Sequence, residues 1–157
     1  MNSETIETRL RDAASAFIGK HLPIGGNVYY RGLRPISKNQ SEYQEDAVVA
    51  FLTGKSGNIQ KGTCLLNVYV SDIHAPSGMY YKDKTRCEEI ATALEKFPDF
   101  ANRNEKDIYF KQSDVILSIA EEEIHQHFVS LKMEFKVYSY YFMLRIFSRI
   151  GDLEYIS

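Results

Sequence analysis

The chain has no tryptophan, only two cysteines and four prolines among its 157 residues, and no long run of apolar residues. Its longest segments without Asp, Glu, Lys or Arg run about ten residues. A membrane-spanning helix needs about 20 apolar residues, so we expect no span and no membrane partner. Cys64 and Cys87 lie in apolar surroundings and do not form a C-x-x-C motif. They indicate two buried, reduced thiols rather than a disulfide.

An excess of charge of one sign is also missing. Nineteen basic residues stand against twenty-one acidic ones, which gives a formal net charge of -2. Nucleic-acid-binding domains usually carry a clearly basic face, so no nucleic-acid site is expected. Met1 to Glu4 leads directly into an amphipathic segment instead of a basic stretch followed by an apolar one. We therefore expect no secretory signal.

The composition is that of a folded domain, with 44% hydrophobic and 25% charged residues. A chain of this length buries roughly 68–70% of its unfolded surface, enough for one core without metals or disulfides. Apolar residues at helical spacing predict a first helix from Thr5 to Ile18, capped by Asn2 or Ser3. A short strand is predicted within 27–33, and a polar loop from Pro35 to Asp46.

The middle of the chain predicts a hairpin with a long connection. Strands are expected at Ala47–Leu52 and Cys64–Val70, and the glycine-bearing segment between them suggests a tip that reaches beyond the domain. A loop is expected from Ser71 to Lys84. Thr85 and Glu88 match a capping box that begins a second helix, which Pro98 is expected to end.

The last part of the chain indicates further strands. Residues 115–120 alternate in polarity, and the segment from Val129 to Val137 alternates most regularly, with Ser130, Lys132, Glu134 and Lys136 on the opposite parity. The segment from Tyr138 to Ile150 fits a strand or a helix equally well. The order predicts an α+β fold: a single domain with a mostly antiparallel sheet and a long β-hairpin packed against two helices.

The strongest signal for a metal site is the pair His125 and His127. Two residues apart on a strand, both imidazoles would share one face, and histidine is the commonest transition-metal ligand. A site needs further ligands, for which His74 or Glu123 are the candidates. The alternative to a metal site is that the two histidines are partly exposed residues at the beginning of a strand. They would then stand beside an acidic turn, Glu121 to Glu123. We expect no metal and no cofactor.

Other catalytic patterns are weaker. Both cysteines resemble small buried hydrophobic residues instead of nucleophiles. Gly54 to Gly57 contains part of a phosphate-loop motif, but it stands between two strands instead of between a strand and a helix. The sequence predicts that the chain is not an enzyme.

Aromatic residues are frequent, with eleven tyrosines and nine phenylalanines. Several tyrosines stand at expected strand ends and loop edges, including the pairs at 29–30 and 80–81. This placement fits a protein interface or ordinary sheet packing. Residues 139–157 form an aromatic-rich extension beyond the expected domain of residues 1–138. The extension is too apolar to stand in water, so we expect it to pack on its own domain or on a neighbour.

The order of elements resembles that of the phage tail-terminator and tail-completion proteins, which join the tail to the head. The resemblance covers about residues 5–138. It depends on the helix Thr5–Ile18, the hairpin Ala47–Val70, the helix Thr85–Phe97 and the strand His127–Tyr138. The segment Leu65–Asp72, with the sequence LLNVYVSD, also looks like members of this family.

The resemblance implies a non-enzymatic structural protein of a phage or prophage tail that assembles into a ring, commonly a hexamer. Its partners would be other copies of itself, a tail-tube protein and a head-tail connector protein. It would be cytoplasmic in the bacterial host during assembly and then part of the virion tail. Two other classes stay open: a small ligand-binding or adaptor domain, and a metal-dependent enzyme using His125 and His127.

Within this interpretation, the hairpin tip Gly54–Gly62 and the loop Pro35–Asp46 are expected to be flexible until they meet a partner, because both are polar and the tip is rich in glycine. The predicted contact residues are Gly54, Lys55, Ser56, Gly57, Asn58, Tyr140, Tyr141 and Phe142.

Overall fold

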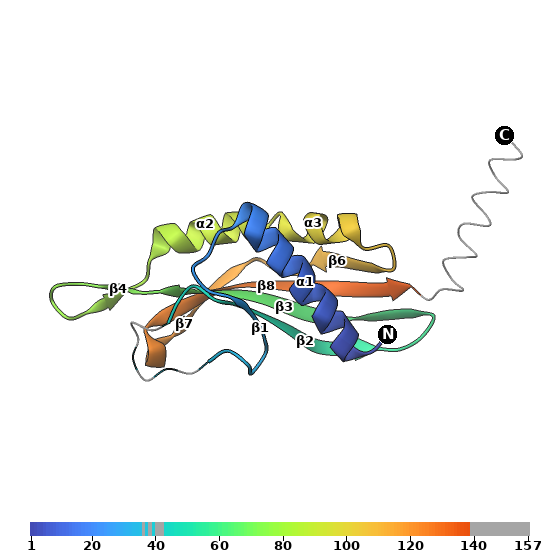
Figure 1. Ribbon diagram of the computed structural model, residues 1–157, viewed down its shortest axis with the longest axis horizontal. Helices are drawn as coiled ribbons and strands as arrows, with labels where there is room; N and C mark the ends of the chain where they lie inside the picture. Colours follow the sequence, from blue (N-terminus) through green and yellow to red (C-terminus); the bar gives the residue numbers. More distant parts are fainter. Residues whose placement is uncertain (36, 38, 40–42, 139–157) are drawn as a thin grey trace, which may run out of the picture.

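Three helices gather on one side of a mostly antiparallel sheet in the computed structural model of the chain (Figure 1). The structure describes residues 1–35, 37, 39 and 43–138. The helices are α1 Ser3–His21, α2 Lys84–Leu94 and α3 Phe97–Asn104. The strands are β1 Val28–Tyr30, β2 Ala47–Lys55, β3 Ile59–Ser71, β4 Ile73–His74, β5 Tyr80–Tyr81, β6 Ile108–Gln112, β7 Leu117–Glu121 and β8 Gln126–Tyr138, the last preceded by a 3-10 turn, η2 Glu122–Ile124.

The main sheet has the order β1-β2-β3-β8-β6, and β7 also pairs with β8. Its strands are antiparallel neighbours except for β1, which runs parallel to β2. The longest pairing joins β3 to β8 over thirteen residues each, from Ile59 opposite Tyr138 to Ser71 opposite Gln126. The predicted α+β fold, with a long hairpin packed against helices, is confirmed.

The core lies between the sheet and the helices. Every second residue of β8 from Val129 to Val137 is buried there, as the alternation predicted. Phe17 of α1 packs edge-on against Phe97 at 5.4 Å between ring centroids, which joins α1 to the start of α3. The opposite side of the sheet carries no helix among the described residues. We call it the open face.

The hairpin tip differs from the prediction. β2 continues to Lys55 and β3 begins at Ile59, so only Ser56, Gly57 and Asn58 form the turn. The expected long connection between the strands, from Gly54 to Gly62, is therefore wrong. The cause is β8, which pairs with β3 up to Ile59 and satisfies the backbone groups of the hairpin along its outer half.

The helix boundaries also required two corrections. Asp83, not Thr85, caps α2: its carboxylate accepts the backbone N–H of Arg86 at 3.1 Å. Pro98 does not end the helical region but lies in the first turn of α3, where its missing N–H would have no helical acceptor anyway. The cap of α1 is Asn2, whose side chain accepts the N–H of Thr5 at 2.8 Å. Helix α3 and strand β6 were not predicted.

Candidate functional site

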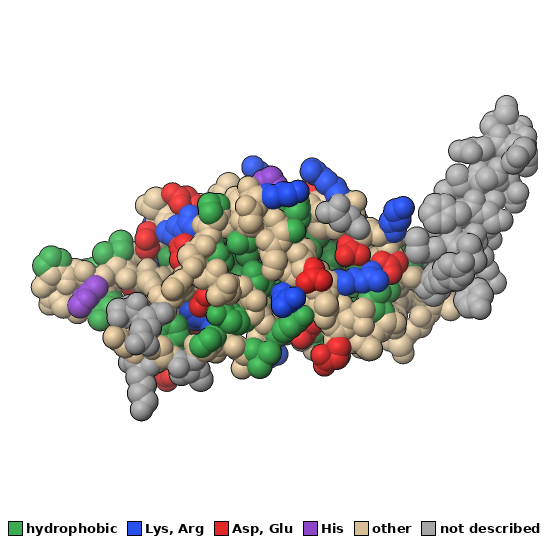
Figure 2. Space-filling view, in the orientation of Figure 1, with side chains coloured by type: hydrophobic (Ala, Val, Ile, Leu, Met, Phe, Trp, Pro, Cys, Tyr) green, Lys and Arg blue, Asp and Glu red, His purple; other side chains and the backbone are tan. Residues whose placement is uncertain are grey.

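A two-stranded arm projects from one end of the molecule. The loop expected between Ser71 and Lys84 contains β4 and β5, paired so that Ile73 lies opposite Tyr81 and His74 opposite Tyr80. Gly78, at φ +86°, turns the chain between them. Three large apolar side chains on the arm are exposed: Ile73 at 52%, Met79 at 58% and Tyr81 at 51%. Hydrophobic side chains gather at this end of the molecule (Figure 2).

The root of the arm is fixed to the sheet by aromatic rings. Tyr80 stacks on His74 at 4.4 Å between ring centroids and on His125 at 3.7 Å, both nearly parallel. The Asp72 backbone N–H donates to the His125 carbonyl at 2.9 Å, and the Asp72 carboxylate lies 2.6 Å from Nδ1 of His127. These contacts hold exposed apolar groups in a defined position.

The histidine pair does not form the metal site that its spacing suggested. His125 precedes β8 in a left-handed conformation, at φ +51°, so it does not share a strand face with His127. One histidine stacks on Tyr80 and the other pairs with Asp72. Within the described part of the chain, no three His, Cys, Asp or Glu side chains converge on a point that could hold a metal ion.

Next to the arm root, an arginine joins the loop after β1 to the open face. Nε of Arg34 lies 2.9 Å from a carboxylate oxygen of Asp46, and its NH2 group donates to the Gln126 side-chain carbonyl at 2.9 Å. The guanidinium stands 4.0 Å from the centroid of the Tyr69 ring. Asp46 and Gln126 are buried. The segment Pro35–Asp46 was expected to be a flexible loop. The ion pair between Arg34 and Asp46 holds its two ends together.

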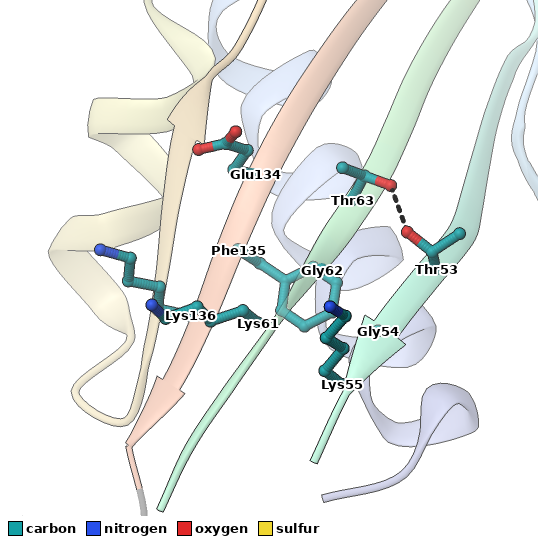
Figure 3. Close-up of a pocket in the computed structure, with 9 residues that line it drawn as sticks. All are labelled: Thr53, Gly54, Lys55, Lys61, Gly62, Thr63, Glu134, Phe135 and Lys136. Atoms are coloured by element: carbon teal, nitrogen blue, oxygen red, sulfur yellow. Dashed lines mark hydrogen bonds between the residues drawn. The ribbon is translucent and has the colours of Figure 1, made fainter. Parts of the chain in front are cut away.

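The open face carries a row of lysines at the end opposite the arm. Lys55 of β2 lies opposite Lys61 of β3, which in turn lies opposite Lys136 of β8. The three side chains spread side by side over consecutive strands (Figure 3). They line a groove of about 500 Å³, and the next row, Thr53 and Thr63, forms a side-chain hydrogen bond of 2.9 Å. We call this site the lysine groove.

Two glycines that line the lysine groove face each other across β2 and β3. Gly54 lies opposite Gly62, and Gly62 lies opposite Phe135. A Cβ on Gly62 would stand 2.0 Å from the Thr53 carbonyl oxygen and 2.6 Å from the Phe135 ring. The close approach of the strands therefore requires glycine at this position.

The two cysteines are free and buried. Burial raises the pKa of the Cys64 thiol to about 12 and also raises that of Cys87. A thiol that stays protonated is a poor nucleophile. Both side chains contribute to the core, as the sequence indicated.

The predicted contact residues lie in two places. Gly54 and Lys55 end β2, and Ser56, Gly57 and Asn58 form the exposed turn. Tyr140, Tyr141 and Phe142 lie outside the described residues. The arm was not predicted from the sequence, because its strands have only two residues each. The tyrosine pair at 80–81 was the available signal.

No family model matches the chain, and no curated protein matches it. None of the helices in the described part has both the length and the apolar run needed to cross a bilayer.

Proposed function

We propose that the chain is a non-enzymatic structural protein that acts by assembly, as a component of a phage or prophage tail. In this role it caps the tail tube or joins it to the head connector as a ring of identical subunits. Its partners are other copies of itself, the tail-tube protein and the connector protein. It assembles in the cytoplasm of the bacterial host and then remains in the virion tail.

The observation that carries the proposal is the arm. Ile73, Met79 and Tyr81 expose about half of their surface at the end of a projecting hairpin. Exposed aromatic and methionine side chains are enriched at protein interfaces. The stacked rings of Tyr80 and His125 hold the arm in place, which reduces the ordering cost of binding. Such an arm favours a contact with another protein.

The polar groups around the arm support the same role. His127 is engaged by Asp72, and Arg34 by Asp46 and Gln126. These side chains therefore orient loops and strands. The order of helix, hairpin, helix and closing strand, on which the resemblance to tail-terminator proteins depends, is also the order of elements in the fold.

The test is the mass of the purified full chain in solution, measured by light scattering on a sizing column over a wide range of concentrations. We expect a closed oligomer of about six subunits whose formation depends on the arm. The variant Ile73→Ser/Met79→Ser/Tyr81→Ser should stay monomeric at concentrations at which the natural chain assembles.

The matched control is Leu33→Ser/Val115→Ser, which removes two exposed apolar side chains outside the arm. It should assemble like the natural chain. A natural chain that stays monomeric at every concentration, and also fails to bind a tail-tube protein, would contradict the proposal.

A further inference from the structure

The lysine groove places like charges directly opposite one another on three neighbouring strands. Lys55, Lys61 and Lys136 share the open face, and all three are exposed. Directly opposed like charges destabilise a sheet. None of the three forms an ion pair with another described residue. Among the described residues, the three ammonium groups therefore repel one another without a partner carboxylate, and a bound anionic group would relieve this repulsion.

The other charged side chains around the lysine groove are matched in pairs, so the three lysines remain as its unmatched charge. Glu134 is the single carboxylate among the residues that line the lysine groove. It lies opposite Lys111 of β6. On the same face and strand, Lys132 follows at a distance of two residues, and its Nζ lies 3.7 Å from a carboxylate oxygen of Asp114. The chain as a whole has a net charge of -2. The positive charge is thus a local feature of this end of the sheet.

A matching group of opposite sign lies at the other end of β8. Glu121, Glu122 and Glu123 precede this strand, and the last two are exposed. None of the three forms an ion pair with another described residue. β8 runs along the length of the molecule (Figure 1). The ten residue-to-residue steps from Gln126 to Lys136 span roughly 33 Å at the rise of a β-strand.

The dimensions of the two groups agree. Neighbouring strands lie about 4.8 Å apart, so the lysine row is roughly 10 Å wide. Consecutive Cα atoms lie 3.8 Å apart, so three successive glutamates extend over at most about 8 Å before their side chains spread. The acidic turn is therefore no wider than the row of lysines that it would meet.

We infer that the lysine groove binds the acidic turn Glu121–Glu123 of a second copy of this chain. The contact joins different surfaces of the two subunits, so it is a head-to-tail contact that closes into a ring or continues as a filament. The inference rests on the proposed assembly function and identifies one of its interfaces.

The experiment uses three full-length variants and light scattering at low and high salt. The basic variant is Lys55→Glu/Lys61→Glu/Lys136→Glu, and the acidic variant is Glu121→Lys/Glu122→Lys/Glu123→Lys. The control, Lys84→Glu/Lys96→Glu/Lys106→Glu, makes the same charge change at exposed positions of the helical layer.

Each of the first two variants should weaken self-association at least about tenfold, and the control should not. An equimolar mixture of the two should restore assembly, because each reversed surface then meets its opposite on the other variant. Assembly of the natural chain should weaken with rising salt. The single variant Lys61→Thr should weaken assembly while raising the thermal stability of the monomer.

Other outcomes overturn the inference, and they separate it from the proposed function. Variants that assemble like the natural chain would leave ring assembly standing with a different interface. Loss of assembly without restoration in the mixture would refute the pairing. A natural chain that does not self-associate at all would refute the inference, and it would contradict the proposed function as well if it also failed to bind a tail-tube protein. Binding of a labelled DNA oligonucleotide, lost in the basic variant while assembly persists, would make the groove a nucleic-acid site instead.

Discussion

Gly62 shows how a single residue sets the geometry of the sheet. Its Cα faces Gly54 across one strand pair and the Phe135 ring across the other. The added methyl of Gly62→Ala would collide with the Thr53 carbonyl oxygen, which belongs to the backbone and cannot rotate away. We expect the free energy of unfolding to fall by about 2 kcal/mol, measured by urea denaturation.

The matched control for this change is Gly19→Ala. Gly19 lies inside α1 and a Cβ there would meet no atom within 4 Å. Alanine is favoured over glycine in a helix, so the same substitution should raise the free energy of unfolding by about 0.5–1 kcal/mol. Equal effects at the two positions would show that the close approach at Gly62 is not what matters.

Cys64 predicts a loss of stability at alkaline pH. Burial raises the pKa of this thiol from its ordinary 9.0 to about 12. Between these two values the unfolded chain has released the proton and the folded chain still holds it. The unfolded state then binds fewer protons, so the free energy of unfolding falls as pH rises, by up to about 1.4 kcal/mol per unit.

The measurement is the free energy of unfolding of the natural chain and of Cys64→Ala between pH 8 and about 11. The alanine variant should start lower, because it leaves a cavity in the core. Its curve should then descend less steeply, so that the gap between the two proteins narrows with rising pH. Parallel curves would mean that Cys64 does not titrate as its burial requires.

At the scale of elements, the strands and helices that could be predicted from the sequence were those with a long, regular spacing of apolar residues. β8 was predicted because five apolar residues alternate over nine positions, and a strand buried on one face must show that period. The ends of β2 and β3 were not predicted, because they depend on pairing with β8, which is distant in sequence. Pro98 was misinterpreted because proline is tolerated in the first turn of one helix as readily as it ends another.

The arm predicts a separation between stability and assembly. Among the described contacts, the Tyr80 ring on His125 is the main link from the arm to the body. An aromatic pair of this kind contributes about 0.5–1.5 kcal/mol. Replacing residues 73–81 by a short Gly-Ser linker should therefore lower the free energy of unfolding by no more than about 1 kcal/mol, as measured by urea denaturation.

The same deletion variant should lose self-association. A control that keeps the arm but substitutes Tyr80→Phe preserves the ring stack and should behave like the natural chain in both measurements. A large loss of stability in the deletion variant would instead make the arm a part of the fold.

For the whole molecule, the candidate site was less predictable than the fold. The lysine groove depends on a register that places Lys55, Lys61 and Lys136 side by side, although the last of them is 75 positions from Lys61 in the chain. Local composition carries no information about that register. The arm depends in the same way on His125, which comes from a distant turn. The hairpin tip could be recognised locally, because its glycines are close in sequence.

The described core is formed by residues from Ile6 to Val137. Within the described residues, β8 is paired as far as Tyr138, which lies opposite Ile59 of β3, and Val137 lies opposite Ile108 of β6. We therefore expect a chain of residues 1–138 to unfold cooperatively, with a single transition in urea that coincides by circular dichroism and tyrosine fluorescence. A broad transition, or one that differs between the two probes, would show that the extension 139–157 is required for the core. If the transition is cooperative, the extension is not needed for folding. Self-association of the chain of residues 1–138 then shows whether the extension contributes to the contact between subunits.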